Sequence, residues 1–66
     1  MQIIVNGAAR EVSAQADMAA ALSELGFADA VVATALNGQF VPSGARSATV
    51  LSPGDQLEVL APMQGG

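Results

Sequence analysis

Two Asn-Gly dipeptides, Asn6-Gly7 and Asn37-Gly38, constrain the fold of this chain more than any other feature of its sequence. Each lies between short runs of apolar and β-branched residues, which are typical of strands. A two-residue type I′ turn needs positive φ at both central positions, and Asn-Gly adopts these angles readily. The sequence therefore predicts two β-hairpins, the first over 1–12 and the second over 30–42, where Pro42 ends the return strand.

The hydrophobic period between the two hairpins is that of a helix. Four apolar residues fall at i, i+3, i+4 and i+7 and share one stripe: Met18, Ala21, Leu22 and Leu25. Asp17 suits the N-cap, and Gly26 suits the C′ position with Phe27 as the apolar contact beyond it. A helix of about two to three turns is not stable alone, so it must pack on a sheet.

The last third of the chain predicts a loop and one more strand. Residues 43–51 look irregular, with Arg46 on a solvated loop and either Val50 or Leu51 turned inward. Pro53 and Gly54 suit the central positions of a type II turn. Residues 56–60 then alternate between apolar and polar or exterior positions, as a strand does.

This order of elements predicts an α+β roll of the β-grasp (ubiquitin-like) type, with a mixed four- to five-stranded sheet and one main helix across one face. The first and last strands are expected to be parallel neighbours at the centre of the sheet. Residues 1–61 are expected to form the domain, and 62–66 to form a flexible tail that ends in Gly-Gly. Ile4 and Leu60 are expected on the face without the helix, where they either bind a protein partner or are ordinary exposed aliphatic residues.

The composition excludes several classes of function. The chain has no Cys and no His, so neither a disulfide nor a zinc site is expected, and no other metal site is predicted. Two arginines against six acids give a net charge of −4, which disfavours nucleic acid as a partner. The usual nucleophiles and bases are missing, so we expect no catalysis by this chain alone.

The sequence also bears on the cellular location of the chain. The first positive charge is Arg10, which does not fit a secretory signal. No apolar run approaches the roughly 18 residues of a membrane span. We therefore expect a cytoplasmic domain that is monomeric when free and binds no membrane.

The C-terminal residues have two interpretations. Pro62 lacks a backbone donor and favours an extended Ala61, so the chain is expected to leave the sheet as an arm. The terminal Gly65-Gly66 is either an unimportant frayed end or a segment that threads a narrow channel, because glycine has no Cβ. In the second case the Gly66 carboxylate is the reacting group, and its conversion to an acyl-adenylate would make it a good electrophile.

Four stretches, "MQIIVNG", "ALNGQFVP", "SPGDQLEVL" and the terminal "QGG", resemble the sulfur-carrier family of thiamin biosynthesis, ThiS, over essentially the whole chain. One departure is Ser43, where the family often has a basic residue that bears on docking. The resemblance implies that an E1-like adenylyltransferase uses Mg-ATP to adenylate Gly66. Sulfur from a desulfurase or rhodanese then gives a thiocarboxylate, which donates its sulfur to thiazole synthase.

The resemblance also implies roles for the residues before Gly66. The tail would thread the activating enzyme through Pro62, Met63, Gln64 and Gly65, with Leu60 at the mouth of the channel. The chain itself would bind no cofactor. Three alternatives stay open. The first is the small subunit of molybdopterin synthase, because the end of this chain, "APMQGG", resembles the tail of that subunit. The others are a ubiquitin-like modifier conjugated to lysines and a β-grasp interaction module whose last two residues are replaceable.

Overall fold

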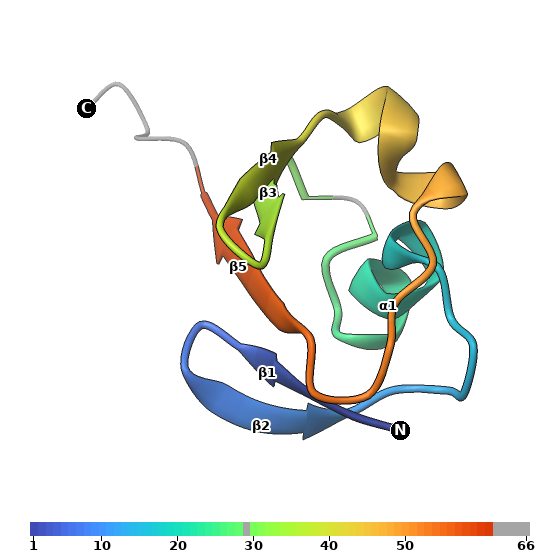
Figure 1. The fold of residues 1–66 in the computed structure, drawn as a ribbon. Helices are drawn as coiled ribbons and strands as arrows, with labels where there is room; N and C mark the ends of the chain where they lie inside the picture. Colours follow the sequence, from blue (N-terminus) through green and yellow to red (C-terminus); the bar gives the residue numbers. More distant parts are fainter. Residues whose placement is uncertain (29, 62–66) are drawn as a thin grey trace.

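The computed structural model describes residues 1–28 and 30–61, which form a five-stranded mixed sheet with one α-helix packed on one face (Figure 1). The elements in chain order are β1 (Gln2–Val5), β2 (Ala8–Glu11), α1 (Met18–Glu24), β3 (Ala33–Leu36), β4 (Gln39–Val41), the 3₁₀ helix η1 (Ser43–Ala48) and β5 (Gln56–Leu60). The strand order is β2-β1-β5-β3-β4, and only β1 and β5 pair in parallel among these strands. The predicted β-grasp roll, with its parallel first and last strands, is confirmed.

Both Asn-Gly turns have the predicted backbone conformation. The φ angles are 49° at Asn6 and 84° at Gly7, and 50° at Asn37 and 85° at Gly38. Val5 pairs directly with Ala8 across the first turn, and Leu36 pairs in the same way with Gln39 across the second. These local preferences close the two hairpins at the two sides of β5.

The C-terminus of α1 ends in the left-handed turn that Gly26 predicts. Gly26 has φ 95°, and its N–H donates to the carbonyl oxygen of Ser23 at 3.2 Å. The Phe27 N–H donates to the carbonyl oxygen of Leu22 at 2.8 Å. These two bonds form a Schellman motif, in which a left-handed glycine and an apolar contact end the helix.

The N-terminus of α1 is capped by Asp17, whose Oδ1 accepts the Ala20 N–H at 2.8 Å. We expect Asp17→Ala to lower the free energy of unfolding by about 1 kcal/mol, because an amide of the first helical turn loses its partner. Asp17→Ser keeps a capping oxygen and is the matched control. Urea unfolding of the three chains measures the difference, and equal stability of the alanine and serine variants would contradict the capping role.

The hydrophobic core lies between the sheet and α1. Ile3 of β1, Met18 of α1 and Leu57 of β5 are its largest fully buried apolar side chains. Leu51 is the residue that turns inward, whereas Val50 is 64% exposed. The alternation of buried and exposed residues along β5 follows the predicted strand pattern.

Three expectations for the middle of the chain were wrong. Residues 43–51 were expected to be irregular, but they contain the 3₁₀ helix η1. The second hairpin begins at Ala33 rather than at residue 30, because the pairing of β3 with β5 ends at the Ala33–Leu60 pair. The carbonyl oxygen of Val32 instead accepts a hydrogen bond from Arg46 Nη2 at 2.6 Å. Arg46 is therefore not on a solvated loop: it is half-buried in η1, and its Nε donates to Thr34 Oγ1 at 3.0 Å.

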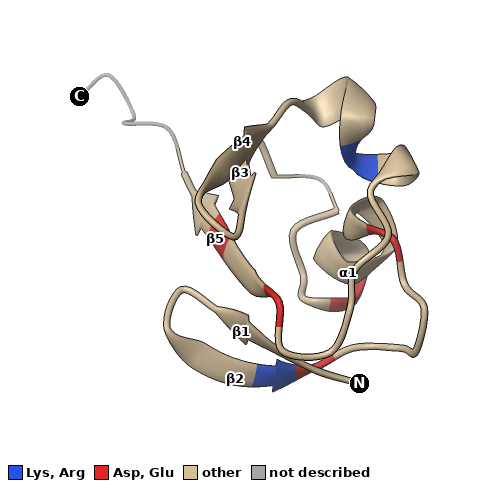
Figure 2. Ribbon diagram, in the orientation of Figure 1, with Lys and Arg blue, Asp and Glu red and all other residues tan. Residues whose placement is uncertain are grey.

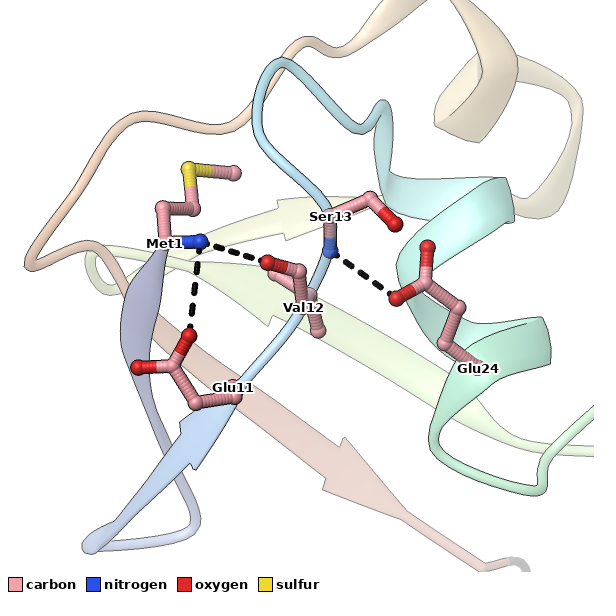
Figure 3. Close-up of polar contacts among 5 residues, drawn as sticks. All are labelled: Met1, Glu11, Val12, Ser13 and Glu24. Atoms are coloured by element: carbon pink, nitrogen blue, oxygen red, sulfur yellow. Dashed lines mark hydrogen bonds and ion pairs between the residues drawn. The ribbon is translucent and has the colours of Figure 1, made fainter.

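The loop after β2 is tied to the beginning of the chain and to the end of α1 (Figure 3). The Met1 ammonium donates to the carbonyl oxygen of Val12 at 2.6 Å and lies 3.5 Å from a Glu11 carboxylate oxygen. The Ser13 N–H donates to Glu24 Oε1 at 2.9 Å. These contacts fix the first hairpin against the helix that covers the core.

Candidate functional site

The residues predicted to carry the chemistry lie outside the described part of the chain. They are Pro62, Met63, Gln64, Gly65 and Gly66. The structure describes the strand that precedes them: β5 ends at Leu60, and Ala61 is the last described residue. The site can therefore be built from the end of β5 and from the sheet face that α1 does not cover.

Strand register places an apolar patch on that open face, beside the end of β5. Leu60 lies opposite Ala33, and Phe40 lies opposite Ala35. Directly opposite residues share a face of the sheet, and residues two apart on one strand do so too. Leu60 is 63% exposed and Phe40 is 69% exposed. We call Ala33, Ala35, Phe40 and Leu60 the open-face patch.

Ile4 lies on the same face as Leu60 but not beside it. Ile3 and Val5 are buried, so the alternation along β1 turns the half-buried Ile4 to the other face. Ile4 pairs with Gln56, four residues before Leu60 on β5, which is about 13 Å along a strand. The two predicted partner residues are therefore on one face, with Ile4 away from the patch around Leu60.

Phe40 is the surface residue that sequence reasoning missed. The prediction treated it only as part of a short return strand. The signal was the strand alternation: Val41 is buried, so its neighbour Phe40 must turn outward. Aromatic residues are enriched in protein–protein interfaces, so an exposed Phe40 strengthens the case that this face of the sheet binds a protein.

An acidic side chain borders the open-face patch. Glu58 of β5 is exposed and lies opposite Ala35, on the same face as Leu60. Figure 2 shows the two basic positions on β2 (Arg10) and on η1 (Arg46). The Arg46 guanidinium binds Thr34, which is buried on the core side of the sheet and not on the open face. With a net charge of −4, the chain is suited to an apolar partner surface bordered by positive charge, which increases the rate of encounter.

The other features of the described residues add no second site. A hollow of about 290 Å³ between α1 and η1 is lined in part by Leu22, Phe27 and Arg46. The Arg46 guanidinium is already bonded to Thr34 and Val32. No cluster of metal-ligating side chains occurs within residues 1–28 and 30–61. None of the helices described there is long and apolar enough to cross a membrane.

The fold is similar to that of a thiamine biosynthesis protein, ThiS, from Geobacter metallireducens. Its crystal structure superimposes with a TM-score of 0.82 at 35% identity, and the match covers 100% of each chain. Its solution structure gives a TM-score of 0.81 at 33% identity and covers 100% of this chain and 88% of that chain.

Sequence comparison gives a consistent result. The chain is 35% identical over 66 residues to a thiazole synthase from Paramagnetospirillum magneticum, and it spans 20% of the length of that relative. The model of the ThiS family matches residues 3–66, which include the strand β5 and the terminal Gly-Gly. The resemblance of the four sequence stretches is thus confirmed, and this chain belongs to the ThiS family.

Proposed function

We propose that this chain is a sulfur carrier of thiamin biosynthesis, a protein cosubstrate rather than an enzyme. The observation that carries the proposal is the ThiS family match, which extends over residues 3–66 and so includes the Gly-Gly end. The likeness to a thiamine biosynthesis protein over the whole chain supports the same pathway. The composition supports a carrier, because the sulfur would be held on a backbone carboxyl group in a chain with no Cys.

The chemistry proceeds at the C-terminal carboxylate of Gly66. A carboxylate resists nucleophiles because it is a resonance-stabilised anion without a leaving group. An E1-like adenylyltransferase would join it to AMP from Mg-ATP and release pyrophosphate. Hydrosulfide attack on this acyl-adenylate would then form the carbon–sulfur bond, expel AMP and release a proton, leaving the thiocarboxylate. A persulfide donor would instead leave an acyl disulfide, which a thiol must reduce to the thiocarboxylate.

We propose thiazole synthase as the acceptor of this sulfur. The curated thiazole synthase that resembles this chain carries the matching region within a longer polypeptide, of which it makes up 20%. In that relative, the region similar to this chain and the rest of the thiazole synthase are parts of one polypeptide. Such a covalent connection raises their effective concentration for each other, which supports a functional contact between them. The activating enzyme and the desulfurase or rhodanese belong to the proposal on the chemistry alone.

The test is the intact mass of the chain after incubation with the host's E1-like enzyme, Mg-ATP and sodium sulfide, followed by fragmentation of the C-terminus. We expect a gain equal to the exchange of one oxygen for sulfur, located on Gly66, and no gain when ATP is omitted. The enzyme must first be shown to act on a known carrier. If it does so and the mass of this chain is unchanged, the proposal is wrong.

The open-face patch gives a prediction for the complex with the activating enzyme. We expect Phe40→Ala to weaken binding about tenfold, because a large exposed aromatic residue often contributes strongly to an interface. Val50→Ala is the matched control, since Val50 is similarly exposed but lies outside the five strands. Isothermal titration calorimetry measures both. Equal affinities of the two variants would place the interface elsewhere.

A further inference from the structure

The asparagines of the two hairpin turns both bind the backbone of β5. Asn6 Oδ1 accepts the Val59 N–H at 2.8 Å, and Asn6 Nδ2 donates to the Val59 carbonyl oxygen at 3.0 Å. Asn37 Oδ1 accepts the Gln56 N–H at 2.9 Å. The turn residues thus have a second role: Asn6 holds the C-terminal end of β5, and Asn37 holds its beginning.

The Asn6 side chain makes the hydrogen bonds to β5 that the next residue of β1 would make if that strand continued. Along the edge of β5 that faces β1, the Ile4 N–H donates to the Asp55 carbonyl oxygen at 2.9 Å, and the Asn6 N–H donates to that of Leu57 at 3.0 Å. The next carbonyl on this edge belongs to Val59, but β1 has ended and the chain turns at Asn6-Gly7. The Asn6 carboxamide satisfies both the N–H and the C=O of Val59 where the backbone ladder stops.

This contact lies at the base of the C-terminal segment. Val59 is followed by Leu60, the last residue of β5, and by Ala61, the last described residue. On the opposite edge of β5, β3 pairs with the same part of the strand through Thr34–Val59 and Ala33–Leu60. The end of β5 is therefore held on both edges, by a strand on one edge and by one side chain on the other.

We infer that Asn6 is a positioning residue for the activation of Gly66, an inference that rests on the proposed function. By holding the Val59 backbone, Asn6 fixes the end of β5 before the carrier meets the activating enzyme. A strand end that is already ordered loses less conformational freedom on docking. Asn6 acts through Val59 and touches no reacting atom, so its removal changes how readily the complex forms rather than the chemical step.

A matched pair of substitutions isolates this role. Asn6→Gly and Asn37→Gly each remove a carboxamide that binds β5, and each leaves a Gly-Gly turn that accepts positive φ at both positions. Steady-state release of pyrophosphate by the E1-like enzyme gives KM for the carrier and kcat for each chain. Urea unfolding reports the loss of stability, and hydrogen exchange of the Val59 amide reports the contact itself.

For Asn6→Gly we expect KM to rise about three- to tenfold with kcat unchanged, as for the loss of an ordering contact made before docking. Its Val59 amide should exchange faster, whereas Asn37→Gly should keep the wild-type KM and the wild-type exchange at Val59. A wild-type KM for Asn6→Gly overturns the positioning role, and so does an equal rise of KM in both variants. If the wild-type chain releases no pyrophosphate, the proposed function fails, and the positioning role fails with it.

Discussion

Deletion of Gly66 is expected to lower the rates of adenylation and of sulfur transfer at least about 100-fold relative to the full chain. The deletion moves the carboxylate back by one residue, which is about 3.5 Å of extended chain. A misplacement of even about 1 Å can cost roughly 100-fold in an enzyme-catalysed step. Pyrophosphate release and the intact mass measure the two steps separately.

The fold provides the control for this deletion. Within residues 1–28 and 30–61, the buried apolar residues fall between Ile3 and Val59, and Gly66 has no side chain to add to this core. Urea unfolding of the truncated chain should therefore match that of the full chain. Gly66→Ala is a milder variant that keeps the length and adds only a methyl group. Sulfur transfer by the truncated chain at the full rate would show that Gly66 is not the carrier position.

Leu57→Ala is expected to lower the free energy of unfolding by about 2–5 kcal/mol. Leu57 lies on the central strand β5 and is 1% exposed, so the substitution removes buried methyl groups and leaves a cavity in the core. A domain of this size has a total stability of only about 3–10 kcal/mol. The variant should therefore be partly unfolded at 25 °C or lose most of its resistance to urea.

Leu60→Ala is the matched control for this substitution, because it makes the same chemical change three residues later on the same strand. Leu60 is 63% exposed, so we expect Leu60→Ala to change the free energy of unfolding by no more than about 0.5 kcal/mol. Urea midpoints of the two variants give the comparison. Equal losses would mean that the buried position of Leu57 does not determine its contribution.

The hairpins and the helix ends could be predicted from the sequence because their causes are local. Asn-Gly favours positive φ at two successive residues wherever it occurs, and both turns have it. Asp17 caps an amide three residues away, and Gly26 closes the helix that precedes it. Together with the alternation along β5, these signals determined the order of elements and hence the β-grasp roll.

The surface of the candidate site could be predicted only in part. Strand alternation placed Leu60 on the open face, but the register of β3 with two neighbours was needed to bring Phe40 into the same patch. Ile4 shares the face, and only its pairing with Gln56 showed that it is remote from Leu60. A tight turn fixes the register within a hairpin, but the register of β5 with β1 and with β3 is set only when the whole sheet assembles.

What the sequence determined by itself was the two hairpin turns, the helix α1, the last strand, and the absence of Cys and His. Its resemblance to the ThiS family was likewise present in the sequence alone. The tertiary structure decided which polar groups meet. Arg46 reaches Thr34 and Val32, and Asn6 reaches Val59 across 53 residues of sequence. The reason is physical: a side-chain hydrogen bond forms where packing leaves a backbone group without a partner, and that place exists only once the strands are assembled.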